Sequence, residues 1–196
     1  LNDMNGKSAG NIDVVLVSYN ERGRVVGFGA LEVQAVYISG NVRRPFEYYM
    51  EDPPSRQDMV WRGRQYYPRA DYLSSSRKRL APQLIFKGGI LNAWGRKIAV
   101  AMDKSFFQTL PKLEETTREK AEVAWLVYDL ELNPAATQYT LSRYQILYTR
   151  FETALTQITR SDPGDESEFI ERLQTKLDEK LEDGNPPDAP TIEVEL

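Results

Sequence analysis

Two runs of β-branched and apolar residues near the start of the chain constrain its fold more than any other feature. Residues 12–19 read IDVVLVSY and residues 25–38 read VVGFGALEVQAVYI, and each run is long enough to form a strand. The segment between them, NERGR, carries the Asn and Gly that are typical of a tight turn. The sequence therefore predicts a β-hairpin, which brings Asp13 at the start of the first strand within reach of the second strand.

The second of these strands contains two polar residues in an apolar setting. Side chains alternate between the faces of a strand, so Glu32 and Gln34 share one face. The other members of that face are apolar: Phe28, Ala30, Val36 and Ile38. A half-exposed strand would show the same alternation, but with more polar positions on this face. A carboxylate among apolar side chains costs several kcal/mol unless a partner or a cation meets it, so we expect a partner for Glu32.

The rest of the chain mixes helix and strand patterns. Residues 41–80 are rich in Pro, Arg and Tyr and are expected to be irregular. Further on we expect a helix over residues 82–94, strands over residues 97–102 and 123–132, and a charged, solvent-facing segment over residues 113–122.

Two further helices are expected near the end of the chain. Apolar residues at steps of three and four predict a helix over residues 140–158 and another over residues 166–182. The first stripe, from Leu141 to Ile158, is more simply a core-facing surface than a partner-binding seam. These elements predict an α/β or α+β fold, a mixed sheet with helices packed on it. We expect one domain over residues 1–183 and a linker-like tail over residues 184–196 that ends in a short strand.

The composition excludes several kinds of chemistry. The 196 residues include no cysteine and no histidine, which excludes disulfides, thiolate or imidazole metal sites, and Cys or His as nucleophile or base. No apolar run approaches the roughly 20 residues of a membrane span, and the start of the chain lacks the pattern of a signal peptide. It also lacks an initiator Met, so we expect a fragment or a trimmed chain.

Charge is distributed unevenly along the chain, although the net charge is only −4. Residues 41–104 hold 13 basic and 6 acidic side chains, whereas residues 105–196 hold 9 basic and 19 acidic ones. A basic middle beside an acidic tail indicates a polyanionic partner for one part of the surface.

Asp13, Glu32 and Gln34 form the candidate site of this sequence. The predicted hairpin would bring two carboxylates and one amide together from adjacent strands. Oxygen ligands of this kind suit Mg²⁺, which keeps several waters and takes further ligands from a phosphate. Such a site favours phosphodiester hydrolysis, because a metal-bound water needs no nucleophilic side chain.

The segments NIDVVLVS and ALEVQA resemble the D…ExK signature of the PD-(D/E)xK nucleases, in the variant with Gln in the lysine place. Residues 69–97 and 104–111 resemble the NotI-type restriction endonucleases, and the resemblance spans roughly residues 10–150. It implies a restriction-endonuclease-like mixed β-sheet flanked by helices. It also implies a Mg²⁺-dependent type II enzyme that cuts double-stranded DNA at a defined sequence and leaves 5′-phosphates. Such enzymes usually act as homodimers in the bacterial cytoplasm.

The resemblance also implies roles for individual residues. Asp13, Glu32 and Gln34 match the catalytic positions, and Asp13, Glu32 and the backbone carbonyl of Val33 match the metal ligands. Gln34 stands where the commoner Lys would orient the attacking water. Asn11 and Ile12 replace the Pro that usually precedes the Asp. Related proteins carry a cysteine-bound iron site upstream, and this sequence has no cysteine, so that module either lies in a missing N-terminal part or is lacking in this protein. The acidic residue that a preceding helix often supplies in these proteins could also lie before residue 1.

The basic middle contains the candidate DNA contacts. Arginines and lysines meet phosphates, arginine reads guanine through paired hydrogen bonds, and serine hydroxyls bond the DNA backbone. The candidates are Arg43, Arg44, Arg62, Arg64, Arg69, Ser75, Arg77, Lys78 and Arg79. Each arginine could instead solvate a loop or pair with a nearby carboxylate. Two other functions stay open: a DNA-binding module of the same fold that does not cleave, and a structural interaction protein that uses the stripe on residues 141–158.

Overall fold

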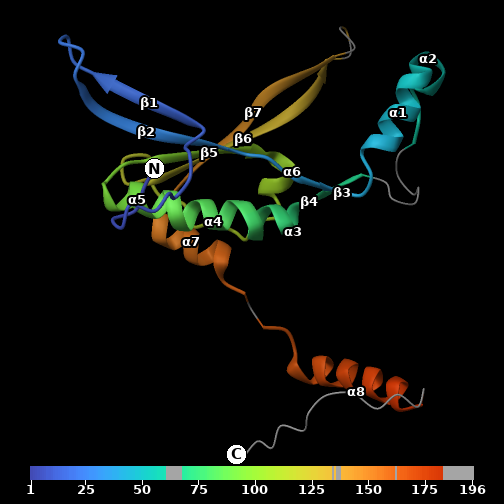
Figure 1. Ribbon diagram of the computed structural model, residues 1–196. Helices are drawn as coiled ribbons and strands as arrows, with labels where there is room; N and C mark the ends of the chain where they lie inside the picture. Colours follow the sequence, from blue (N-terminus) through green and yellow to red (C-terminus); the bar gives the residue numbers. More distant parts are fainter. Residues whose placement is uncertain (61–67, 134, 136–137, 162, 183–196) are drawn as a thin grey trace, which may run out of the picture. The chain divides into compact units, whose positions relative to one another are not determined.

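The structure is a computed structural model, which describes residues 1–60, 68–133, 135, 138–161 and 163–182 (Figure 1). The chain divides into two compact units, Leu1–Arg160 and Ser161–Leu196. The first unit contains the sheet and all candidate site residues. In the second unit the structure describes one helix, α8 (Glu166–Glu182), which confirms the helix predicted over these residues.

A mixed sheet of five strands forms the centre of the first unit. Its strands are β1 (Val14–Tyr19), β2 (Val25–Gln34), β5 (Ile98–Asp103), β6 (Val123–Asn133) and β7 (Gln138–Thr149), in the spatial order β1-β2-β5-β6-β7. β2, β5 and β6 run parallel, and β1 and β7 pair antiparallel at the two sides. The α+β fold with a mixed sheet and flanking helices is therefore confirmed, as is the predicted hairpin, in which Val14 pairs with Leu31.

A continuous helical stretch over residues 72–93 crosses from β4 (Arg69–Asp71) to β5. It consists of α3 (Tyr72–Ser75), η1 (Ser76–Leu80), α4 (Ala81–Gln83), η2 (Leu84–Gly88) and α5 (Gly89–Ala93), where η1 and η2 are π-helical turns. The helix predicted over residues 82–94 is present but begins ten residues earlier. Pro82 lies inside it, and because Pro has no N–H for a regular α-helical bond, the flanking π turns mark where the hydrogen bonding departs from the α pattern.

Two predictions from the sequence are wrong. The segment 41–80 is not wholly irregular: it holds α1 (Arg43–Glu51), α2 (Pro53–Arg56), and strand β4 (Arg69–Asp71) paired with β3 (Tyr37–Ser39). The helix predicted over residues 140–158 is mostly strand β7, and only α7 (Phe151–Thr159) is helical. Pairing with β6 along its whole length gives this segment more stabilisation than a lone amphipathic helix would.

The remaining predicted elements have clear outcomes. The strands predicted over residues 97–102 and 123–132 are confirmed as β5 and β6. Residues 113–122 are mostly exposed, although Leu113 and Ala121 are buried. A short helix, α6 (Lys104–Phe107), precedes them. The strand predicted at the end of the chain lies outside the described residues.

The core lies between one face of the sheet and the helices. In β5 and β6 alternate residues are buried, among them Val100 and Trp125, and they pack against residues of the long helical stretch such as Leu84 and Leu91. Phe151 of α7 completes this cluster. Figure 1 shows the helical stretch and α7 on the same side of the sheet. The face of β2 that turns toward these helices is the one that carries Glu32 and Gln34.

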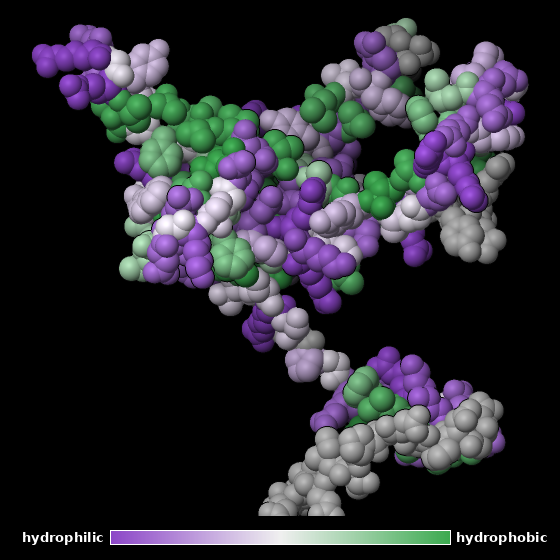
Figure 2. Space-filling model, in the orientation of Figure 1, coloured by the Kyte–Doolittle hydropathy of each residue, from purple (hydrophilic) through white to green (hydrophobic). Residues whose placement is uncertain are grey.

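The β1–β2 hairpin is the most exposed part of the sheet. All six residues of β1 are exposed, including Leu16 at 64%. Figure 2 shows apolar surface along this hairpin and a hydrophilic tip, which corresponds to the turn after Tyr19. Among the described residues, no helix combines the length and apolar character that crossing a membrane requires.

Candidate active site

The alternation of β2 places Glu32 and Gln34 inside the protein. Their exposed fractions are 2% and 4%, whereas Val33 between them is 56% exposed. A strand turns successive side chains to opposite faces, so the two polar residues point toward the helices and Val33 points away. The prediction that Glu32 and Gln34 share a buried face is therefore confirmed.

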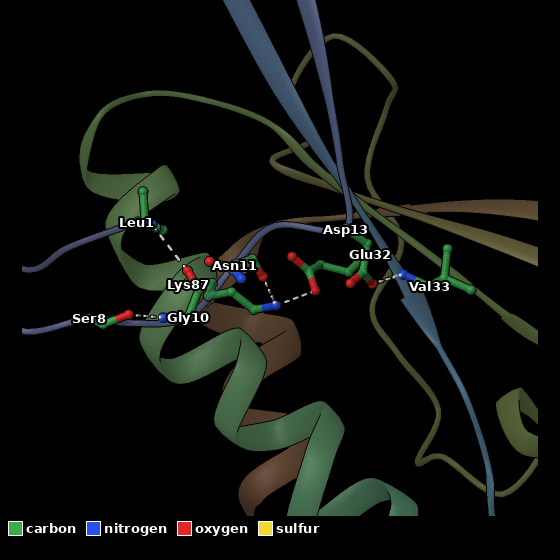
Figure 3. A network of polar contacts seen from close by, with 8 residues as sticks. All are labelled: Leu1, Ser8, Gly10, Asn11, Asp13, Glu32, Val33 and Lys87. Atoms are coloured by element: carbon green, nitrogen blue, oxygen red, sulfur yellow. Dashed lines mark hydrogen bonds and ion pairs between the residues drawn. The ribbon is translucent and has the colours of Figure 1, made fainter.

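Asp13 meets β2 at the point where the pairing of β1 with β2 ends. The last paired residues are Val14 and Leu31. Beyond this pair, the Asp13 carboxylate bonds to β2 in place of the backbone of β1. Its Oδ2 accepts a hydrogen bond of 2.8 Å from the Val33 N–H (Figure 3). The N–H and C=O of one strand residue point to the same neighbour, so the Val33 carbonyl also faces the Asp13 side of β2. The hairpin thus brings Asp13, Glu32 and Val33 together.

Lys87 is the partner of Glu32. Its ammonium forms an ion pair with Glu32 Oε2 and donates a second hydrogen bond of 2.9 Å to the carbonyl oxygen of Asn11 (Figure 3). Both side chains of the ion pair are buried, with exposed fractions of 6% and 2%. Lys87 comes from the η2 turn of the helical stretch, 55 residues away in the sequence from Glu32.

Burial raises the pKa of the Glu32 carboxyl above its ordinary value of 4.5. The hydrogen bond and the positive charge of Lys87 lower that pKa, and the nearby negative charge of Asp13 raises it. The burial effect is the largest of these, so the carboxyl holds a proton more readily than a free glutamate does. The Asp13 carboxylate bonds the N–H of Val33, the residue after Glu32, and Figure 3 shows the two carboxylates side by side.

Two buried oxygens of this site have no hydrogen-bond partner. They are Glu32 Oε1 and Gln34 Oε1, while the Gln34 amide nitrogen donates to the Ala35 carbonyl at 3.0 Å. Buried polar atoms are nearly always bonded, so an unbonded pair of oxygens marks a candidate place for a ligand. The described residues contain no group of three or more acidic, His or Cys side chains that could hold a metal. Two carboxylates with neutral oxygens nevertheless fit Mg²⁺, which is commonly bound by one or two carboxylates plus substrate phosphate.

Comparison with known protein families identifies the family of the chain. The model of restriction endonuclease NotI matches residues 1–141 of the 196, a range that includes Asp13, Glu32, Gln34 and Lys87. The chain belongs to the NotI restriction endonuclease family. Its function is accordingly of the restriction endonuclease type, with DNA as substrate. No curated protein matches the chain.

Several of the predicted DNA contacts of this NotI-family chain lie on the surface. Arg44, Arg77 and Lys78 are exposed. Arg43 is exposed too, and its guanidinium pairs with Glu47 on the next turn of α1. Contact between DNA and these four residues stays a prediction.

Other candidates have roles within the fold. Arg69 is exposed and bonds the Ser39 hydroxyl at 3.3 Å, and Arg79 stacks over the Tyr37 ring at 4.8 Å. Ser75 is fully buried: its hydroxyl donates to the Asp71 carbonyl and accepts from the Tyr37 N–H. That placement ties the helix to β3 and leaves no hydroxyl for a DNA phosphate. Arg62 and Arg64 lie outside the described residues.

Sequence reasoning missed Lys87, although a signal was present. In the run LIFKGGIL the lysine is the only charged residue, and its neighbours predict a buried helix face. A lone lysine on such a face needs a carboxylate partner. The only acidic residue predicted to be buried was Glu32, so Lys87 was a candidate partner for it, although the sequence does not show that the two side chains meet.

Proposed function

We propose that this protein is a Mg²⁺-dependent type II restriction endonuclease, which cuts double-stranded DNA at a specific sequence and leaves 5′-phosphates. The observation that supports it best is the meeting of Asp13 with β2 beside buried Glu32, whose Oε1 has no partner in the protein. Oxygen ligands with open positions suit a hard divalent ion at a phosphodiester.

Each residue of the site would have its own role in the reaction. Asp13 and Glu32 would hold the ion, and the Val33 carbonyl would add a third oxygen from the same side of β2. Mg²⁺ bound there would neutralise phosphate charge and make a coordinated water more acidic. Gln34 would orient that water through its unpartnered Oε1, which can accept a hydrogen bond. No cysteine or histidine is needed, in agreement with the composition.

Double-stranded DNA as the substrate fits the charge of the chain. The basic middle segment, with 13 basic and 6 acidic residues over positions 41–104, offers positive side chains to phosphates. The two strands of DNA run in opposite directions, and a homodimer with two-fold symmetry supplies one site of matching orientation for each strand. We therefore propose a homodimer as the active form.

The deciding experiment is cleavage of a large, sequence-diverse DNA with Mg²⁺, with EDTA, and with the Glu32→Gln variant. We expect discrete fragments from the wild type with Mg²⁺ only. Glu32→Gln should lower the rate at least about 100-fold, because several kcal/mol of charge stabilisation depend on the bound ion. Labelling of the product ends tests for the 5′-phosphates.

Binding separates loss of chemistry from loss of fold. In Ca²⁺, the Glu32→Gln variant should bind this DNA with the same affinity as the wild type. Wild-type protein that binds DNA without ever cutting would contradict the proposal and indicate a DNA-binding module of the same fold. Absence of salt-dependent DNA binding would contradict both and favour a structural protein.

A further inference from the structure

Lys87 is the one lysine or arginine among the buried residues of the described chain, and 5% of the whole residue, backbone included, is exposed. Burying an ammonium is costly, and a buried ion pair is often no more stable than a pair of apolar residues of the same size. Stability alone is therefore a weak reason for placing a lysine in the core beneath β2. Its location against the candidate metal ligand indicates a task at the site.

The bonds of Lys87 join three parts of the chain at one nitrogen. The side chain extends from η2, bonds Glu32 on β2, and bonds the carbonyl of Asn11 two residues before Asp13. Figure 3 shows the ammonium between these two acceptors. One nitrogen thus fixes both the Glu32 carboxylate and the segment that leads into Asp13.

Each of the two carboxylates is held by one of its oxygens. Lys87 bonds Glu32 Oε2 and leaves Oε1 without a partner, and the Val33 N–H bonds Asp13 Oδ2. A carboxylate fixed in this way presents its other oxygen in a defined direction. Partners that orient metal ligands commonly affect metal affinity or activity by 10–100-fold when removed.

Gln34 cannot take over this task. Its side chain carries no charge, and its amide nitrogen bonds the Ala35 carbonyl next to it in the chain. Among the described residues, the structure shows no hydrogen bond from the Gln34 side chain to Glu32 or to the segment before Asp13. A positive charge for Glu32 must come from another element, and the helical stretch supplies it.

We propose that Lys87 is a positioning residue of the nuclease site, which orients Glu32 and the Asn11-to-Asp13 segment for a divalent cation. This inference rests on the proposed function and extends it to a residue outside the hairpin motif. Lys87 acts through Glu32: it bonds the oxygen that faces the helix, and the opposite oxygen stays available to the ion.

The test compares Lys87→Met with Lys104→Met. The second variant breaks another lysine–carboxylate pair, in which Lys104 of α6 bonds Asp129 of β6 at 2.7 Å. Two quantities are measured well below the Tm of each variant: Mn²⁺ affinity of the free protein by calorimetry, and the single-turnover cleavage rate at saturating DNA and Mg²⁺. For Lys87→Met we expect both to fall about 10–100-fold. Lys104→Met should match the wild type in both.

The outcomes separate this inference from the proposed function. Equal Mn²⁺ affinity and equal rate in Lys87→Met and the wild type would overturn the role of Lys87 and leave the nuclease function intact. A wild type that binds Mn²⁺ but never cuts would contradict the nuclease function, and the affinity comparison would still decide the role of Lys87. A wild type that neither binds Mn²⁺ nor cuts DNA with Mg²⁺ would overturn both. If the wild type cuts without measurable Mn²⁺ affinity, the comparison of cleavage rates decides the role of Lys87.

A second variant covers the case in which Lys87→Met does not fold. Lys87→Arg keeps the positive charge and the donors, so we expect it to fold and to retain Mn²⁺ affinity within about tenfold of the wild type. A folded Lys87→Arg protein with no Mn²⁺ affinity would overturn the inference, because charge and hydrogen bonding to Glu32 would then be insufficient.

Discussion

At the scale of single residues, Glu32 links the candidate site to stability. Its pKa is raised above 4.5 because the carboxyl is buried, so the folded state binds the proton of Glu32 more tightly than the unfolded state does. That contribution to stability is full below pH 4.5 and is lost as the pH rises through the folded-state pKa. We expect the free energy of unfolding of the wild type, measured relative to Glu32→Gln by urea denaturation, to decrease with pH. A single proton limits the slope to about 1.4 kcal/mol per pH unit.

Repeating this measurement in the Lys87→Met background shows the influence of the lysine. Lys87 lowers the folded-state pKa of Glu32, so without it the decrease should extend to a higher pH and its total should be larger. A relative stability that instead increased with pH would mean that the ion pair outweighs burial and that the Glu32 pKa is lowered in the folded protein.

The placement of Asp13, Glu32 and Gln34 could be predicted because it depends on local geometry. Strand alternation alone fixes that Glu32 and Gln34 share a face. A tight turn after β1 brings β2 back alongside the start of β1, where Asp13 lies. Lys87 could not be placed in this way, since its contact with Glu32 spans 55 residues and depends on how the helical stretch packs on the sheet. The sequence predicted that Glu32 needs a partner, and the three-dimensional fold was required to identify it.

At the scale of elements, the helical stretch packs closely against α7 at Gly88. A Cβ added there would lie 2.7 Å from Phe151 Cε2, and Phe151 is buried, so the ring has little room to move. We expect Gly88→Ala to lower the free energy of unfolding by about 1–3 kcal/mol through overpacking. Thermal or urea denaturation measures the change.

The neighbouring glycine is a matched control for this effect. Gly89 has ordinary helical backbone angles, and a Cβ added to it meets no atom within 4 Å. Gly89→Ala should therefore stabilise the protein by about 0.4–1 kcal/mol. If both variants had the same stability, the close packing of Gly88 against Phe151 would be refuted.

The β6–β7 pair contains a buried polar bond that can be tested in the same way. Trp125 Nε1 donates to Thr149 Oγ1 at 3.0 Å, and both residues are fully buried. Thr149→Val removes the acceptor and leaves the indole N–H unbonded, which should cost about 1–3 kcal/mol. Thr140→Val, the same change at an exposed position of β7, should alter stability by less than about 0.5 kcal/mol. Equal effects of the two changes in urea denaturation would argue against the bond.

The error in predicting β7 has a physical cause. Leu141, Tyr144, Tyr148 and Phe151 happen to follow helical spacing, but the segment also contains several β-favouring aromatic and Thr residues. Twelve residues of strand pairing with β6 decide between the two, and that pairing is not visible in the local pattern. By contrast β5 and β6 were predicted correctly, because their apolar runs are short and suit strands buried on one face.

At the scale of the whole molecule, the core extends beyond the part that matches the family model. The match ends at residue 141, inside β7. Phe151 and Ala154 of α7, which are 2% and 1% exposed, lie after it and belong to the same core cluster as Trp125. A fold built from the matched residues alone would lack these side chains.

Two truncations test where the folding unit ends. The described core residues all lie within Leu1–Arg160, so a chain that stops after Arg160 should keep the Tm of the full chain within a few degrees. A chain that stops after Arg150 loses Phe151 and Ala154, and deleting one buried Phe side chain alone costs about 3–5 kcal/mol. Against a total stability of about 5–15 kcal/mol, this loss should lower Tm strongly or prevent folding. Calorimetry and circular dichroism of the two chains give the answer. Equal Tm values would show that α7 is dispensable, whereas a large loss in the longer chain would place part of the stabilising structure in residues 161–196.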